Sequence, residues 1–316
     1  MSLLTRIHSF FSKGQSDQLV GISLQQESIT LCSLPALVAP TSEEGSSVSD
    51  AIFEHKNLNQ LDFSHVITEL DFTGKCHLVL SAQQSQIVQI DKPTVPTAEI
   101  NAALKWQVKD LVSISPDNMV LDYFDGPILA GGKEKIHVVC APINELKQIV
   151  AATNKDSAEV VSITTVEFAF TNLLATQSDA CLLVCQQPNE EIVLLIVKQG
   201  KLYFHRRLRG FRQIADKTED ELAMTVIDNL ALEVQRSSDY FERQLKQASI
   251  KEIKVLLPMD NEIFFARKLA ENSDVPVTLL ALPEAYQQYR SYAAAIGATM
   301  YEAKIAEQAQ DTMDVS

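Results

Sequence analysis

Hydrophobic positions along the chain follow two periods, one typical of strands and one typical of helices. Short alternating or continuous apolar segments predict strands, and stripes spaced three to four residues apart predict helices. The first two strands are expected to pair across a bend at Gln25, Gln26 and Glu27. In the first half of the chain, the predicted strands are 19–22, 28–34, 77–81, 86–91, 119–124, 135–141 and 160–165, and helices are predicted to begin at Thr97, Pro142 and Glu167.

The segment 86–165 contains strand, helix, strand, strand, helix and strand in that order. This order is typical of the split βαβ motif, so it predicts a unit that is inserted into a larger domain. Thr97 is a favourable N-cap for the first of these helices. The core-facing stripe of that helix is predicted to consist of Ile100, Leu104, Val108 and Leu111.

The second half begins with a predicted meander of three strands, 180–185, 192–198 and 201–208, with a tight turn at Gln199-Gly200. Thr218 or Asp220 is expected to cap a long helix that runs to about residue 247. Strands and helices then alternate. The pattern predicts strands at 252–257 and 275–280 and helices at 262–272 and 283–296.

Composition and charge limit the classes of protein to which this chain can belong. The chain has 316 residues and a net charge of −14, which disfavours a nucleic-acid-binding protein. No segment is long and apolar enough to cross a membrane. Residues 3–11 form a short amphipathic stripe, which could lie on a membrane surface or pack on the protein itself. Residues 41–50 are polar and predict a loop.

Catalytic and metal-binding motifs are absent from the sequence. The five cysteines are dispersed without a CxxC pair, which is typical of a reduced protein and predicts no metal site. The six histidines show no HExxH spacing, and there is no P-loop, GxGxxG or GxSxG motif. We therefore expect neither a bound metal nor an enzyme of these classes.

Three segments carry a resemblance to a known family. Residues 98–107 (AEINAALKWQ), with Pro116 and the segment VLDY at 120–123, resemble the inserted subdomain of the PilM family of type IV pilus proteins. Residues 233–242 (EVQRSSDYFE) resemble the long helix of that family. The Ala-rich run at 292–297, which ends in Ile296-Gly297, is similar to the family's closing helix. The three segments occur in the family's order, and the resemblance covers residues 18–298.

The resemblance implies an α/β, actin-like duplicated fold with ribonuclease H-like halves and an inserted βαββαβ subdomain. It implies a cytoplasmic scaffold, peripheral to the inner membrane, that holds the cytoplasmic tail of a bitopic PilN-like protein (MshJ-like in the MSHA pilus system) within a pilus assembly platform. The expected parts are an amphipathic segment (1–16), the first actin-like subdomain in two pieces (17–85 and 162–178), the inserted subdomain (86–161), the second actin-like domain (179–298) and an acidic tail (299–316).

The family's nucleotide-binding loops are altered in this chain. Actin-like ATPases hold phosphates with two hairpins in which an Asp organises Mg²⁺ and Gly permits close backbone approach. In the first hairpin the Asp position is Ser23, and Gln25 stands where Gly is expected. The second hairpin carries Cys185 and Gln187 at the corresponding positions, and Glu190 and Glu191 would repel phosphate. The degenerate positions are Ser23, Gln25, Gln26, Thr30, Cys185, Gln187, Glu190 and Pro258.

These losses predict a pseudo-ATPase without a cofactor. The first alternative is a genuine switch in pilus assembly or type II secretion that still binds ATP and Mg²⁺ through diverged loops. A second alternative is an actin-like kinase or phosphatase, which would need a catalytic carboxylate near a Gly-rich loop. Neither hairpin supplies that arrangement.

Two groups of residues are candidates for binding a partner. Trp106 lies beside the centre of its helix's core stripe, so it is either a packing residue or an aromatic anchor in the groove for the partner's tail, and Tyr123 and Phe124 are weaker candidates of the same kind. The run 205–212 is densely basic in an acidic protein. Arg207 and Arg209 share one face of its strand, and they either pair with neighbouring acids or dock an acidic partner or lipid headgroups.

Overall fold

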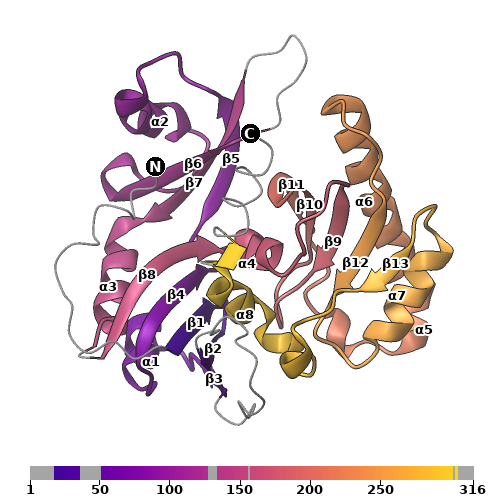
Figure 1. The fold of residues 1–316 in the computed structure, drawn as a ribbon, viewed down its shortest axis with the longest axis horizontal. Helices are drawn as coiled ribbons and strands as arrows, with labels where there is room; N and C mark the ends of the chain where they lie inside the picture. The colour runs from indigo at the N-terminus through magenta and orange to yellow at the C-terminus, as the bar shows by residue number, and fades with distance from the viewer. Residues whose placement is uncertain (1–17, 36–50, 127–133, 156, 302, 305–316) are drawn as a thin grey trace, which may run out of the picture. The chain divides into compact units, whose positions relative to one another are not determined.

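The computed structural model describes residues 18–35, 51–126, 134–155, 157–301 and 303–304. Within these residues the chain divides after Thr165 into two units, and each contains one five-stranded sheet (Figure 1). The predicted amphipathic segment at 1–16, the loop at 41–50 and most of the acidic tail lie outside the described residues. The finer domain boundaries therefore stay a prediction.

The main sheet of unit 1 has the order β3-β2-β1-β4-β8. Strands β1, β2 and β3 pair antiparallel, whereas β1, β4 and β8 run parallel. The strands are β1 (Gln18–Leu24), β2 (Ser28–Pro35), β3 (Ile52–Asn57), β4 (Gly74–Leu80) and β8 (Ala158–Thr165). The predicted pairing of the first two strands is confirmed. Strand β3 was not predicted, because four of its six residues are polar and none of the six is buried at this sheet edge.

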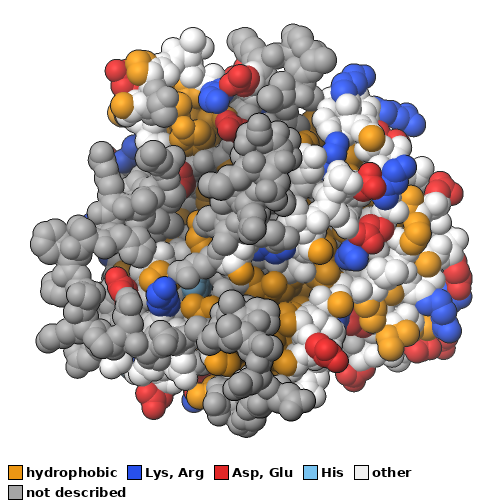
Figure 2. All heavy atoms as spheres, viewed as in Figure 1, with side chains coloured by type: hydrophobic (Ala, Val, Ile, Leu, Met, Phe, Trp, Pro, Cys, Tyr) orange, Lys and Arg blue, Asp and Glu red, His pale blue; other side chains and the backbone are white. Residues whose placement is uncertain are grey.

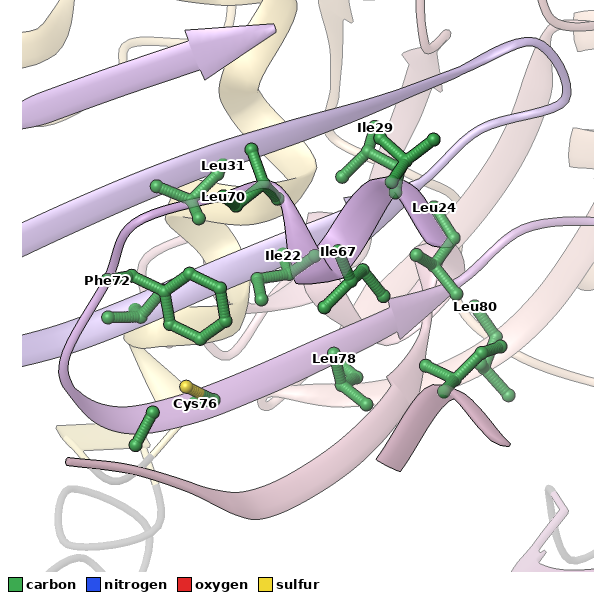
Figure 3. Close-up of a cluster of buried hydrophobic side chains, with 14 of the residues drawn as sticks. Ile22, Leu24, Ile29, Leu31, Ile67, Leu70, Phe72, Cys76, Leu78 and Leu80 are labelled. Atoms are coloured by element: carbon green, nitrogen blue, oxygen red, sulfur yellow. The ribbon is translucent and has the colours of Figure 1, made fainter. Parts of the chain in front are cut away.

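One face of this sheet holds the core of unit 1. Side chains of β1, β2 and β4 point toward Ile67 and Leu70 of the α1 region (α1, Phe63–Thr68), as Figure 3 shows. Helix α3 (Ile143–Thr153) packs beside α1 and contributes Ile149 to the same cluster. Burial of these apolar side chains supplies the main favourable free energy for folding of the unit.

A second, three-stranded sheet of unit 1 has the order β5-β7-β6, with α2 (Ile100–Val108) packed against it. Its strands are β5 (Gln86–Asp91), β6 (Met119–Asp125) and β7 (Lys135–Pro142). Ile100, Leu104 and Val108 are buried as predicted, but Leu111 is 56% exposed. The expectation for Leu111 was wrong because α2 ends at Val108, three residues before it.

The inserted unit also differs from the predicted βαββαβ arrangement. Strand β8 does not join the small sheet; it pairs parallel with β4, from Gly74 opposite Ala158 to Leu80 opposite Thr165. Helix α3 likewise packs on α1 of the main layer. The element order alone does not fix the partner of the last strand. Without β8, the buried strand β4 would have an unpaired edge, and such edges are normally covered.

Unit 2 repeats the strand order and directions of the main sheet of unit 1, as β11-β10-β9-β12-β13. The strands are β9 (Cys181–Cys185), β10 (Val193–Lys198), β11 (Lys201–Arg207), β12 (Glu252–Leu256) and β13 (Val277–Leu279). The predicted turn at Gln199-Gly200 is confirmed, and both residues have the positive φ values, 53° and 67°, that a type I′ turn requires. The same strand order and strand directions in both sheets indicate an internal duplication of the fold.

The long helix of unit 2 and helix α7 begin and end close to the predicted positions. A capping box at Thr218 starts a continuous helical segment made of α5 (Glu219–Glu221), a π-helical turn (Leu222–Val226), α6 (Ile227–Asp239) and a second π-helical turn (Tyr240–Gln244). Helix α7 (Glu262–Glu271) follows β12. Helix α4 (Val166–Asn172) packs against the closing helix α8 (Ala293–Thr299).

The single helix predicted at 283–296 is wrong in its first half. Two separate 3₁₀ turns, Glu284–Tyr286 and Arg290–Tyr292, precede α8. Arg290, the first residue of the second turn, donates through its guanidinium to the Leu280 carbonyl at 3.0 Å and the Val255 carbonyl at 3.3 Å. These bonds hold the segment against the ends of β12 and β13, so it does not continue as one straight helix.

Replacement of Gly297 by Ala should destabilise the protein. A Cβ at this position would lie 2.0 Å from the carbonyl oxygen of Ala169 in α4. An ordinary Gly-to-Ala change within a helix stabilises by about 1 kcal/mol, whereas this one should cost about 1–3 kcal/mol through overpacking. Denaturant unfolding measures the change, and a more stable variant would disprove the close α4–α8 packing.

Candidate functional site

The carboxyl ends of parallel strands are where ligands usually bind in α/β sheets. In unit 1 this edge is formed by the ends of β1, β4 and β8, and in unit 2 by the ends of β9, β12 and β13. Strands β1 and β9 occupy equivalent places in the two sheets. Each is followed by two glutamines, Gln25-Gln26 after β1 and Gln186-Gln187 after β9. The sequence prediction singled out three of these four residues and missed Gln186.

The hairpin between β1 and β2 is closed by its own side chains. Ser23, Gln25 and Thr30 are each at most 1% exposed. The Gln25 side-chain amide donates to Thr30 Oγ1 at 3.3 Å and accepts from Ser28 Oγ at 2.8 Å. Gln26 is partly exposed at the bend. Gln25 therefore fills the inside of the turn, where a phosphate-binding loop would carry Gly.

The loop after β4 closes the neighbouring strand end in a similar way. The side-chain oxygen of Gln84 accepts hydrogen bonds from the backbone N–H and the hydroxyl of Ser81, at 3.0 and 2.5 Å. The Ser85 hydroxyl donates to the Ser81 carbonyl at 3.0 Å. All three residues are buried. The sequence signal that could have indicated this loop is the run of small and polar residues directly after a predicted strand.

Gln186 closes the hairpin between β9 and β10. Its amide nitrogen donates to the carbonyl oxygens of Glu190, at 2.6 Å, and Phe211, at 2.8 Å. Its backbone N–H donates to Leu256 at the end of β12, at 3.1 Å. Cys185, Gln187 and Glu190 are buried around it. The hairpin is thus joined both to the next strand end and to the turn at residue 211.

Glu191 occupies backbone donors beside this hairpin. Its carboxylate accepts hydrogen bonds from the N–H groups of Gly210, at 3.2 Å, and Phe211, at 2.8 Å. Paired backbone N–H groups of this kind are the donors that phosphate oxygens use in anion-binding loops. In this protein they already have an anionic acceptor from the chain itself.

A buried carboxylate, that of Glu262, binds the backbone of the segment after β12. Glu262 accepts from the Leu257 N–H at 2.6 Å and forms an ion pair with Arg290 at 2.5 Å, while Pro258 lies between strand and helix, partly exposed. Burial raises the pKa of Glu262, and the nearby Arg290 guanidinium opposes this shift. The sequence prediction identified Pro258 here but missed Glu262 and Arg290, which are 28 residues apart.

Arg207 belongs to a second buried ion pair. Its side chain is 26% exposed and its guanidinium lies 2.6 Å from the carboxylate of Glu167 in α4, which is fully buried. Burial lowers the pKa of the neighbouring His205. Arg209 is exposed. The two arginines that were predicted to act together therefore have different surroundings.

The three aromatic candidates of unit 1 also have different surroundings. Trp106 is 66% exposed on α2, with the Lys109 ammonium 5.7 Å from its ring. Phe124 stacks on His137 at 4.8 Å, and Tyr123 packs against the apolar cluster between α2 and the small sheet. Trp106 is therefore largely exposed, whereas Tyr123 and Phe124 are partly covered by packing.

Comparisons with known proteins identify the fold. No protein-family model and no curated protein sequence matches the chain. Among solved structures, PilM of a PilM–PilN type IV pilus biogenesis complex is similar, with 14% identity and a TM-score of 0.64 over 91% of this chain and 99% of that one. The chain has the fold of PilM. The predicted class, an actin-like duplicated α/β fold, is thereby confirmed.

Two further solved structures are similar at lower scores. One is the cytoplasmic domain of EpsL from the Vibrio cholerae type II secretion system, with 12% identity and a TM-score of 0.44 over 77% of this chain and 83% of that one. The other is a Bacteroides thetaiotaomicron protein described as having an actin-like ATPase fold, with 11% identity and a TM-score of 0.48 over 92% and 99% of the two chains.

The described part of the chain contains neither a candidate membrane span nor a candidate metal site. None of its helices is long and apolar enough to cross a bilayer. The same residues contain no cluster of His, Cys, Asp and Glu that could hold a metal ion. All five cysteines are buried and free.

Removal of the Arg207 side chain should destabilise the protein far more than removal of Arg209. Arg207→Ala leaves the buried carboxylate of Glu167 without its cation, which should cost about 3–5 kcal/mol. Arg209→Ala removes an exposed side chain and should change stability by less than about 0.5 kcal/mol. Urea unfolding of both variants is the measurement. Equal effects would contradict the buried pair.

Proposed function

We propose that this protein is a scaffold of a type IV pilus assembly platform, an MshI-like component of the MSHA type, located at the cytoplasmic face of the inner membrane. The observation that carries this proposal is the fold shared with PilM, whose solved structure is a complex with PilN. A PilN-like or MshJ-like bitopic protein is the proposed partner. Other platform proteins would contact the chain through surfaces separate from that partner's tail.

The strand-end loops support a pseudo-ATPase. Close approach of phosphate to a hairpin requires backbone N–H groups that are free and positions without a side chain. Gln25 and Gln186 instead fill the two hairpins, and Glu191 already occupies two N–H groups. Glu190 and Glu262 add buried carboxylates at the edge in unit 2. Each of these features disfavours a bound polyphosphate.

The exposed face of α2 is the proposed docking site for the partner's tail. Trp106 is 66% exposed, and Leu111 and Val95 on the adjoining segments are also exposed. Large aromatic side chains that stay exposed in a folded protein are frequent anchors in protein interfaces. Because Ile100, Leu104 and Val108 supply the core side of α2, Trp106 is available for binding without a role in the core.

The protein should show no thermal stabilisation by nucleotide. A ligand present at about 100 times its dissociation constant stabilises a protein by about 2.7 kcal/mol, which would shift the melting temperature by several degrees. We expect no shift with millimolar Mg²⁺-ATP or Mg²⁺-ADP in differential scanning fluorimetry, checked by calorimetry. A saturable shift would instead favour a nucleotide-gated switch in pilus assembly or secretion.

Trp106→Ala should weaken binding of the partner's tail at least about tenfold while it leaves the melting temperature nearly unchanged. The binding assay is calorimetric titration with a peptide of the PilN-like protein's cytoplasmic tail. Asn101→Ala, at an exposed position of the same helix, serves as the matched control and should bind as tightly as the wild type. Unchanged binding by the Trp106 variant would place the docking site elsewhere.

A further inference from the structure

A basic pocket lies on unit 2, between the end of β11 and the long helical segment. Its volume is about 790 Å³, which is within the usual range for ligand sites. The lining comes from the end of β11 and the turn that follows, from Lys217, and from the segment between Thr225 and Arg236. We call this site the β11–α6 pocket. All its lining residues belong to one unit.

The charge of the pocket opposes that of the chain. Five cations line it, Arg206, Arg207, Arg209, Lys217 and Arg236, against one carboxylate, Glu233. The chain as a whole has a net charge of −14. In Figure 2, Lys and Arg side chains also lie beside Asp and Glu side chains on the surface around α6. A local excess of positive charge in an acidic protein favours an anionic ligand at that place.

Contacts inside the pocket show which anion its arginines accept. Arg206 and Arg236 both bind the Glu233 carboxylate, with nitrogen–oxygen distances of 3.0 and 2.5 Å. Arg207 is engaged by the buried Glu167. Among the described residues, neither Arg209 nor Lys217 has a carboxylate within ion-pair distance. Glu221 of α5 is near enough to Lys217 for the two charges to interact, but it forms no ion pair with it. Both cations can therefore accept a carboxylate from outside the chain.

The pocket also has an apolar part. Leu232 is 52% exposed although it lines the site, and Val226 is partly exposed beside it. Leu208 and Phe211 line the site from the strand side and are buried. Charged donors next to an exposed apolar patch match a ligand that carries carboxylates and an aliphatic side chain together.

We propose that the β11–α6 pocket binds an acidic peptide segment of a protein partner, with its carboxylates on Arg209 and Lys217 and an aliphatic side chain on Leu232. This is a second docking surface, distinct from the face of α2 in unit 1, and it does not depend on the proposed pilus function. The two cations without an ion pair come from separate segments, Arg209 from the turn after β11 and Lys217 from the segment before α5, which suits an extended peptide better than a single phosphate.

The experiment uses the full chain and a fluorescein-labelled peptide of eight residues, with five Glu and three Leu. Fluorescence anisotropy should show saturable binding that weakens as NaCl rises from 50 to 300 mM, because the contacts are ionic. Arg209→Glu with Lys217→Glu should weaken binding at least about tenfold. Lys201→Glu with Lys251→Glu makes the same charge change at two exposed positions of unit 2 outside the pocket, and should weaken it less than about threefold.

Further arms separate the remaining possibilities. A peptide with Lys in place of Glu should not bind. A peptide with Ser in place of Leu should bind the wild type more weakly than the Glu–Leu peptide does, whereas the Leu232→Ser variant should bind these two peptides equally. Arg209→Ala with Lys217→Ala provides a second variant should the charge reversals unfold the protein. The proposal is overturned if the Glu–Leu peptide does not bind, if both charge-reversal pairs weaken it equally, or if inorganic phosphate or Mg²⁺-ATP displaces it at concentrations matched in ionic strength to NaCl controls.

Discussion

Backbone groups at the carboxyl edge of a parallel sheet need hydrogen-bond partners, and in this protein the chain's own side chains supply many of them. Gln25 bonds across the first hairpin, and Gln186 bonds to two carbonyls around the second. Arg290 donates to the carbonyls of Val255 in β12 and of Leu280, which directly follows β13. In nucleotide-binding sheets of this kind a ligand and its waters would take such positions. In this protein the strand ends are held by hydrogen bonds within the chain.

Two buried ion pairs extend this internal closure in unit 2. Glu167 joins α4 to the end of β11 through Arg207, and Glu262 joins the first turn of α7 to the segment before α8 through Arg290. A buried pair adds little net stability when it is compared with apolar packing, yet the loss of one partner is costly because the other charge stays buried. Each pair therefore fixes the position of a helix relative to the sheet more than it increases the free energy of unfolding.

The same residues explain why the basic run at 205–212 has more than one role. Arg207 points to a buried carboxylate and Arg206 to a partly exposed one, so both contribute to the structure of unit 2. Arg209 continues into the turn, which Gly210 makes possible with a φ of 91°. Alternation along a strand sends neighbouring side chains to opposite faces. One short basic segment can therefore serve both internal ion pairs and an external pocket.

The sequence by itself determined most element types, because periodicity reports which face of a strand or helix is buried. The hairpin at Gln199-Gly200 and the core stripe of α2 up to Val108 follow from local patterns, and so does a helix cap at Thr218 or Asp220, of which the structure uses Thr218. The sequence also indicated the loss of Gly from both hairpins. Only the tertiary structure decided that β8 pairs with β4, that Arg290 meets Glu262, and that Trp106 is exposed while Arg207 is paired. These facts depend on contacts between residues far apart in the chain, and a local pattern of polar and apolar positions does not specify which distant partner a strand edge or a charged side chain meets.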